Sequence, residues 1–319
     1  MRALVTGASG FAGQWLCSEL LDRGWSVAGT MLGDVVPTST LSLEKRRSIR
    51  WVSCDVRRRP DVARTLDESR PDAIFHLAGV ASQGMASANP GLALEVNVAG
   101  AGNVLAEADA RRLAGTCDPT VLVVGSGEQY GRHDESEMPL VESAELRPLT
   151  VYAASKAAQE LVALAQHRSG GLKVIAVRSF NHSGQGQSDA YVLPALVKRA
   201  LALRNSWKQE LIVGNATPVR DFTHVSDVVR AYVMLVERGR AGEVYNVSSG
   251  CGVDVATLAH RVLALVGTDA RLQSDPALAR PVDVPALVGD PTKLRLATGW
   301  TPQHDLDFII TDLIHAASD

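Results

Sequence analysis

Along the first half of the chain, short apolar runs alternate with longer segments whose apolar positions recur every three or four residues. The first pattern is typical of buried β-strands and the second of amphipathic helices. The apolar runs predict strands at 2–6, 25–30, 50–53, 73–77, 120–125 and 173–178. The periodic segments predict helices near 11–23, 60–69, 91–112 and 151–169. Strands and helices in alternation predict an α/β fold with a parallel sheet covered on both faces.

Composition narrows the class of protein. The 319 residues are 46% hydrophobic, enough for a large core and about two domains. A net charge of −3 gives no basic surface for nucleic acid. Four cysteines lack Cys-x-x-Cys spacing, so we expect free thiols and no metal site. No apolar stretch approaches the about 18 residues of a membrane span, and no leader precedes the first strand, so we expect a cytoplasmic protein.

Tyr152 and Lys156 stand four residues apart in a segment predicted to be helical. Positions i and i+4 share one face of a helix. A phenol has a pKa of about 10, and a neighbouring cation lowers it towards the range needed for acid–base catalysis. The pair therefore indicates proton exchange with a carbonyl or alcohol oxygen. A buried tyrosine beside a solvated lysine is the alternative.

A glycine-rich turn follows the first predicted strand. The segment 7–13 reads Gly-Ala-Ser-Gly-Phe-Ala-Gly and leads into a predicted helix. Gly7 allows a tight turn, Gly10 lets a pyrophosphate approach the backbone, and Gly13 lets helix and strand pack closely. Strand, glycine turn and helix are the setting of a dinucleotide-binding fingerprint.

Together these motifs resemble the sugar-nucleotide branch of the extended short-chain dehydrogenase/reductase family. Further matching pieces are Asp55-Val56, His76-Leu77-Ala78-Gly79, Asn97-Val98-Ala99-Gly100, the segment 125–131 and Arg220-Asp221-Phe222. The resemblance covers nearly the whole chain. It implies a Rossmann-type doubly wound parallel sheet with a smaller, interleaved C-terminal substrate lobe. The dinucleotide-binding domain is expected at 1–181 plus 218–244, and the substrate lobe mainly at 182–217 plus 245–319, with some segments returning to the large domain.

The cofactor that the resemblance implies is NAD(P), in the form of NADPH or NADH. An acid at the end of the second strand favours NAD, but Met31 stands at that position. We therefore expect use of both cofactors, with a preference for NADPH. The residues expected at the cofactor are Gly7, Ser9, Gly10, Phe11, Ala12, Gly13, Met31, Asp55, Val56, Leu77, Ala78, Gly79, Tyr152 and Lys156.

The family also implies roles at the reacting carbon. Ser126 is expected to bind the sugar oxygen while Tyr152 exchanges the proton. Lys156 is expected to bind the nicotinamide ribose and to lower the pKa of Tyr152, and Asn97 to support the lysine. Glu128 is ambiguous, because a glutamate here removes a proton in 4,6-dehydratases and is also present in 4-keto reductases.

The segment Arg178-Ser179-Phe180-Asn181-His182, followed by 184–187, is similar to that of 4-keto reductases for GDP-linked 6-deoxyhexoses. The resemblance implies reduction of the 4-keto group of GDP-4-keto-6-deoxy-D-mannose to GDP-D-rhamnose, a step of deoxysugar biosynthesis. A guanidinium binds phosphate oxygens with two hydrogen bonds, which suits arginines at a diphosphate. The residues expected at the substrate are Ser126, Asn181, Lys198, Arg220 and Arg280.

Three alternatives are a 4,6-dehydratase similar to those for GDP-mannose, a 4-epimerase and a non-catalytic dinucleotide sensor. The segment 184–188 lacks the arginines of the dehydratase insertion, and Asn97 replaces the aspartate typical there, which favours the reductase. The loop 80–90 departs from the family pattern, so the sugar stays open. Helices 91–112 and 151–169 resemble the pair that builds a homodimer through a four-helix bundle.

Overall fold

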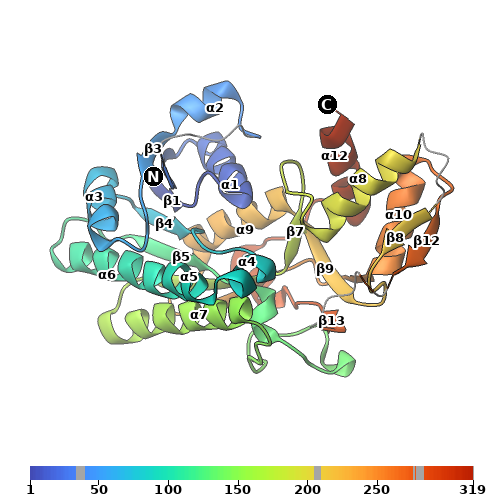
Figure 1. Ribbon diagram of the computed structural model, residues 1–319. Helices are drawn as coiled ribbons and strands as arrows, with labels where there is room; N and C mark the ends of the chain where they lie inside the picture. Colours follow the sequence, from blue (N-terminus) through green and yellow to red (C-terminus); the bar gives the residue numbers. More distant parts are fainter. Residues whose placement is uncertain (34–39, 205–209, 276, 278–283, 319) are drawn as a thin grey trace.

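The computed structural model describes residues 1–33, 40–204, 210–275, 277 and 284–318, and shows a large α/β unit beside a smaller lobe (Figure 1). A seven-stranded parallel sheet with the order β10-β6-β5-β4-β1-β2-β3 forms the large unit. The strands are β1 (Arg2–Thr6), β2 (Ser26–Met31), β3 (Arg50–Ser53), β4 (Ala73–His76), β5 (Thr120–Val124), β6 (Val174–Ser179) and β10 (Val244–Val247). The predicted doubly wound α/β fold is confirmed.

Helices cover both faces of this sheet because successive strand residues point to opposite sides. Leu4 of β1 packs in one cluster and its neighbour Val5 in the other. One face carries α1 (Phe11–Asp22), α9 (Val225–Arg238) and α11 (Thr292–Thr298), and the other carries α3 (Arg59–Ser69), α6 (Gly100–Leu113) and α7 (Val151–Gly170).

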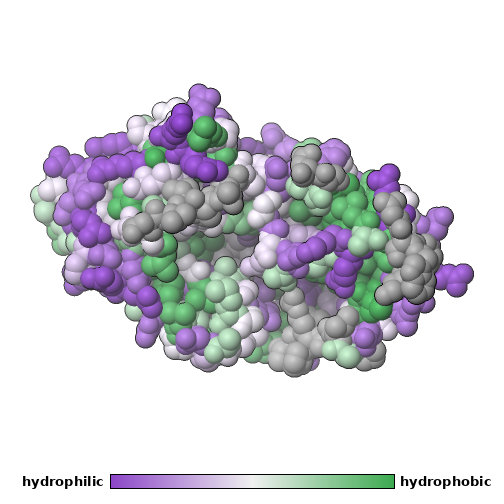
Figure 2. Space-filling view, turned by 45° about the horizontal axis from the view of Figure 1, so that its top comes forward, coloured by the Kyte–Doolittle hydropathy of each residue, from purple (hydrophilic) through white to green (hydrophobic). Residues whose placement is uncertain are grey.

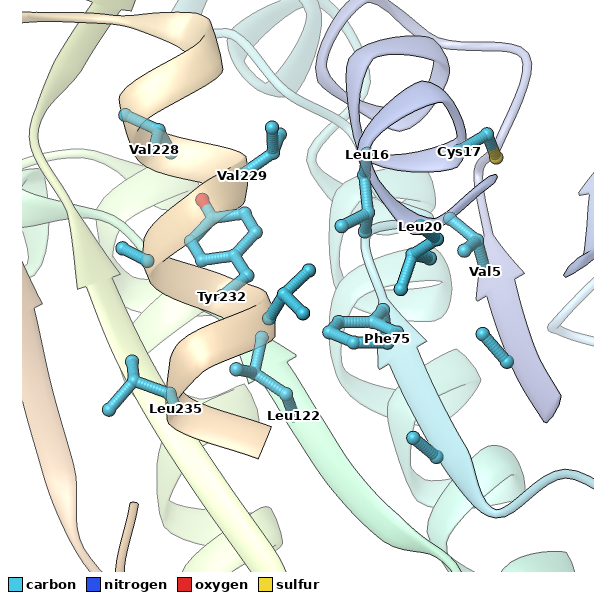
Figure 3. Close-up of a cluster of buried hydrophobic side chains, with 14 of the residues drawn as sticks. Val5, Leu16, Cys17, Leu20, Phe75, Leu122, Val228, Val229, Tyr232 and Leu235 are labelled. Atoms are coloured by element: carbon cyan, nitrogen blue, oxygen red, sulfur yellow. The ribbon is translucent and has the colours of Figure 1, made fainter. Parts of the chain in front are cut away.

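The core between α1, α9 and the sheet is drawn in Figure 3. Leu16 and Leu20 of α1 point towards Phe75 of β4, and Tyr232 of α9 and Leu122 of β5 belong to the same cluster. Full burial of a side chain such as leucine contributes about 1.5–3 kcal/mol. This packing fixes α1, and with it the glycine turn before that helix.

The smaller lobe has two short sheets and its own core. One sheet has the order β11-β9-β13 with β7 beside β9, and the other pairs β12 with β8. The elements are β7 (Asn181–Ser183), α8 (Val192–Arg204), β8 (Glu210–Val213), β9 (Val219–His224), β11 (Gly252–Asp254), α10 (Val255–Val266), β12 (Arg271–Ser274), β13 (Ala286–Leu287) and α12 (Leu306–Ser318). The chain crosses between units more than once, because β9 lies in the second sheet while α9 and β10 belong to the large unit.

The helix predicted at 91–112 is divided in the structure. Pro90 starts α5 (Pro90–Leu94), a π-helical turn follows at Glu95–Ala99, and α6 begins at Gly100. The turn brings the Asn97 side chain onto the backbone of Val80, which apolar periodicity could not reveal. The remaining elements are α2 (Leu43–Ser48), α4 (Gln83–Ala88) and the 3-10 turns Gly127–Tyr130 and Glu135–Glu137.

The first and last helices meet through a loop that follows β7. The indole of Trp15 in α1 donates to the carbonyl of Gln185 over 3.0 Å, and the Gln185 amide donates to Asp312 of α12 over 2.7 Å.

Hydrophilic residues cover much of the face shown in Figure 2. Within the described ranges, we find no helix long and apolar enough to cross a membrane and no cluster of three metal-ligating side chains.

Candidate active site

Three predicted motifs lie at one edge of the large sheet. Strands β4, β1 and β5 are parallel, and β4 lies between the other two. The glycine turn therefore lies at the same edge as the segment 77–79 after β4 and Ser126 after β5. This edge is where open α/β sheets bind ligands.

The glycine turn fits a dinucleotide. Gly7 has a φ of +72°, and a Cβ on it would lie 2.8 Å from the Ala78 nitrogen. A Cβ on Gly13 would lie 2.2 Å from the Gly7 carbonyl oxygen. Gly10 precedes α1 and offers no side-chain cap, and the described first turn holds no acidic residue. The amides of that turn are therefore well suited to a pyrophosphate.

The other expected cofactor residues lie near the start of α1, or at and just after the ends of strands of the large sheet. The Phe11 ring stacks on His182 with centroids 6.1 Å apart. A hydrogen bond from Arg57 holds the pKa of Asp55 below its ordinary value. Met31 ends β2. The remaining residues of the set are Ser9 and Ala12 at the start of α1, buried Val56, and Leu77, Ala78 and Gly79 after β4.

The Tyr152 phenol is buried beside Ser126, with 9% of the residue exposed. Burial is the main cause that raises its pKa, the Glu128 carboxylate raises it further, and a hydrogen bond with the Ser126 side chain acts in the opposite direction. The prediction that the lysine lowers the pKa of Tyr152 is therefore wrong for this structure. Removing water from around a phenol disfavours its charged form, and this effect decides the direction of the shift here.

The Lys156 ammonium lies beneath the same edge. It donates to the Val124 carbonyl at the end of β5 and to the Gln159 side chain, each over 2.9 Å. Burial lowers the pKa of Lys156 to about 8. A Cβ on Gly79 would lie 2.8 Å from Asn97 Oδ1 and 3.4 Å from Lys156 Nζ, so the contact with Asn97 is what favours glycine here.

Asn97 supports the helix that carries Lys156. Its hydrogen bonds, among the described residues, go to Val80 and Ser155. Its Oδ1 accepts from the Val80 amide over 2.8 Å. Its Nδ2 donates to the Val80 carbonyl over 3.2 Å and to the Ser155 hydroxyl over 2.8 Å. Asn97 therefore ties the segment after β4 to α7 one residue before the lysine.

Glu128 lies in the 3-10 turn that Ser126 caps. Its Oε2 accepts a hydrogen bond of 2.7 Å from Gln83 of α4. Tyr191, just before α8, also lies near Glu128. Burial raises the pKa of its phenol, and the charge of Glu128 raises it further. The Tyr191 hydroxyl donates to the Ala81 carbonyl over 3.4 Å, which joins the two units across the site.

The expected substrate residues are less closely gathered. Asn181 begins β7 and pairs in register with Phe222, two residues after Arg220 of β9. Lys198 lies on an exposed face of α8, where it pairs with Asp189 over 2.5 Å. Arg280 lies outside the described residues.

Sequence reasoning missed Gln83, Ser155, Gln159 and Tyr191. Gln159 could have been found three residues after Lys156 on the same helix face. For His76, the sequence predicted no role beyond its place in the His76-Leu77-Ala78-Gly79 motif. It is buried against Thr6, and burial, followed by the charge of Lys156, lowers its pKa to about 3, so its ring stays neutral.

Residues 3–248 match the model of the NAD dependent epimerase/dehydratase family. The chain belongs to this family. A GDP-6-deoxy-D-mannose reductase of Pseudomonas aeruginosa is 31% identical over 303 residues, which are 95% of this chain and 92% of that protein. The structure of RMD from Pseudomonas aeruginosa complexed with NADPH has a TM-score of 0.84 and 27% identity, with 99% of each chain covered. Thermus thermophilus UDP-glucose 4-epimerase in complex with NAD has a TM-score of 0.85 and 29% identity, over 100% of this chain and 99% of that one.

Membership of the NAD dependent epimerase/dehydratase family confirms the resemblance drawn from the glycine turn and the Tyr152–Lys156 pair. It makes the chain an NAD(P)-dependent enzyme of the oxidoreductase type. The similarity to these three relatives extends beyond the large sheet into the smaller lobe, since nearly the whole chain is covered.

Proposed function

We propose that this enzyme reduces the 4-keto group of GDP-4-keto-6-deoxy-D-mannose to give GDP-D-rhamnose. The position of the buried Tyr152 phenol beside the Ser126 hydroxyl carries the proposal, because a protonated phenol held there can give its proton to a carbonyl oxygen as a general acid. Reduction of a carbonyl requires such an acid, whereas dehydratases and epimerases must first remove a proton from an alcohol. The similarity to a GDP-6-deoxy-D-mannose reductase over 95% of the chain supports the same reaction.

In the proposed reaction, Ser126 and Tyr152 hold the C4 oxygen from the end of β5 and the start of α7. Tyr152 gives its proton to that oxygen as the carbonyl becomes an alcohol. NAD(P)H supplies the hydride when it is bound. Lys156 stabilises the phenolate that Tyr152 leaves behind, and the backbone carbonyl of Val124 and the side chain of Gln159 keep its ammonium in place.

Both reduced cofactors would fit the glycine turn, because its uncapped amides would bind the pyrophosphate common to the two. The 2′ position of the ribose distinguishes them, and the neutral side chain of Met31 at the end of β2 rejects neither. The two complexes among the relatives contain NADPH and NAD. We propose that this enzyme uses both, with a preference for NADPH.

For the substrate diphosphate we propose Asn181 and Arg220, which come from the paired strands β7 and β9. Arg280 is a further proposed ligand from the sequence alone. Lys198 is the weakest member of this set, because its exposed ammonium is already paired with Asp189.

A 4,6-dehydratase is the second candidate, and Glu128 is the observation that favours it. Its carboxylate lies near Tyr152, where a base that removes the C5 proton would stand. The two reactions differ in cofactor use. A reductase consumes one NAD(P)H for each sugar, whereas a dehydratase regenerates its cofactor in every cycle.

The deciding experiment supplies the purified enzyme with GDP-4-keto-6-deoxy-D-mannose and either NADPH or NADH. We expect a stoichiometric loss of the nicotinamide absorbance and GDP-D-rhamnose as the product by NMR. Unchanged absorbance with this sugar, together with water loss from GDP-mannose, would replace the reductase by the dehydratase.

We also propose a homodimer built by α6 and α7. Leu113 of α6 is 72% exposed, and Leu161 and Val162 of α7 are 59% and 37% exposed. Small residues such as Ala154 and Ala158 let a second pair of helices approach closely. Sedimentation velocity should give twice the chain mass, and a monomer at micromolar concentration would contradict the four-helix bundle.

A further inference from the structure

A glutamine of α4 reaches the carboxylate beside the proposed proton donor. Gln83 Nε2 donates to Glu128 Oε2 over 2.7 Å, although the two residues are 45 positions apart in the chain. Both side chains are partly buried. Glu128 lies close enough to Tyr152 for its charge to act on the phenol. Gln83 is therefore connected to the proposed proton donor through one intervening side chain.

The position of Gln83 is fixed by the short helix that carries it. Ser82 caps α4 and accepts from the Met85 amide over 3.3 Å. Ala86 is fully buried in a small cluster with Val80 and Tyr152. The residue before the cap, Ala81, accepts the hydroxyl of Tyr191. Gln83 thus reaches Glu128 from a segment held on both sides.

This contact bears on an unwanted reaction of a 4-keto sugar. The hydrogens on C3 and C5 are acidic because the adjacent carbonyl delocalises the charge left when either is removed. A carboxylate near C5 can take that proton, and the sugar then exchanges it or loses its configuration. A hydrogen bond from an amide stabilises the charged form of a carboxylate and makes it a weaker base. The amide itself offers no basic site near neutral pH.

We infer that Gln83 is a positioning residue that restrains Glu128 from acting as a base at C5, so that the 4-keto sugar is reduced without exchange of its C5 hydrogen. The inference rests on the proposed reductase function. The suppressed reaction involves no oxidation: the C5 proton moves to the Glu128 carboxylate, an enolate remains, and a proton from solvent returns to C5.

The test measures exchange at C5 in D2O with GDP-4-keto-6-deoxy-D-mannose and NADP⁺, so that no reduction competes. We expect the wild-type enzyme to match the enzyme-free background. Gln83→Met, which keeps the side-chain length and removes the donor, should accelerate loss of the C5 proton NMR signal by about 10-fold or more, since a general base contributes about 10²–10⁴. The double variant Gln83→Met, Glu128→Gln should return to background.

The matched control is Met85→Gln on the same helix, whose side chain is 61% exposed and should leave exchange at background. Gln83→Leu provides a second removal of the donor if Gln83→Met does not fold. The inference is overturned if a folded Gln83 variant still reduces the sugar but exchanges no faster than wild type, or if its exchange persists without Glu128. Failure of the proposed function would look different, because wild-type enzyme would then leave NADPH and NADH unconsumed with this sugar.

Discussion

Glu160 of α7 and Arg178 of β6 form a buried ion pair, with 2.6 Å between Oε1 and Nη2. The same glutamate accepts from Gln129 over 2.8 Å, and Gln129 in turn accepts from the Ser126 amide over 2.8 Å. A chain of four residues therefore connects a buried charge of the core to the residue whose hydroxyl is proposed at the substrate oxygen.

Arg178→Met should lower the free energy of unfolding by about 3–5 kcal/mol, because it leaves the Glu160 carboxylate buried without its cation. Urea unfolding at pH 7 measures the loss. Arg261→Gln removes one partner of the exposed pair with Asp307 and should change stability by about 0–1 kcal/mol. Equal effects of the two substitutions would show that the buried pair has no special role.

Tyr152→Phe should reduce kcat by about 10²–10⁴, the usual contribution of general acid catalysis. The ring and its packing against Val80 and Ala86 are retained, so the unfolding transition should move little. Fluorescence titration with NADPH should give a Kd close to that of the wild type. A variant that reduces the sugar at the wild-type rate would remove Tyr152 from the proposed mechanism.

The rate of reduction should fall on the alkaline side with a midpoint near pH 8. Tyr152 keeps its proton there because its pKa is raised, and His76 is already neutral because its pKa is about 3. The pKa of Lys156 is about 8, so its ammonium is charged below this pH and neutral above it. Loss of that charge should lower kcat by about tenfold for each further pH unit.

Lys156→Arg is the control for this pH dependence. A guanidinium stays charged through the whole range, so the variant should be slower at pH 7 but should lack the decline near pH 8. A decline at the same pH in both enzymes would assign it to another group.

Gly7→Ala should raise the Kd for NADPH, and backbone strain alone should not account for the whole increase. Gly7 and Gly24 have φ of +72° and +75°, so alanine at either position adds about 1–2 kcal/mol of backbone strain. Only the Cβ on Gly7 meets a neighbour, at 2.8 Å from the Ala78 nitrogen, whereas the Cβ on Gly24 meets nothing within 4 Å. Gly24→Ala should therefore lose stability and keep its affinity for NADPH. Equal Kd values would contradict the role of the turn.

Six strands of the large sheet could be predicted because each is a short apolar run next to a periodic helix, whereas the seventh, β10 (Val244–Val247), was not predicted. The Tyr152–Lys156 pair could be predicted because a helix brings its fourth neighbour to the same face. The sign of the pKa change of Tyr152 could not, because it depends on how completely the fold removes water from the phenol. The contact between Gln83 and Glu128 could not either, because no local pattern relates α4 to the turn after β5.

The hydrogen bonds that Trp15 and Asp312 make to Gln185 have a consequence for experiments on shortened chains. A truncated chain that ends before Asp312 would lack the acceptor that fixes the loop against α1. Deleting the last eight residues would thus disturb the dinucleotide end of the molecule, about 300 positions away along the polypeptide. Tags and fusions at the carboxyl terminus are best judged by cofactor affinity as well as by yield.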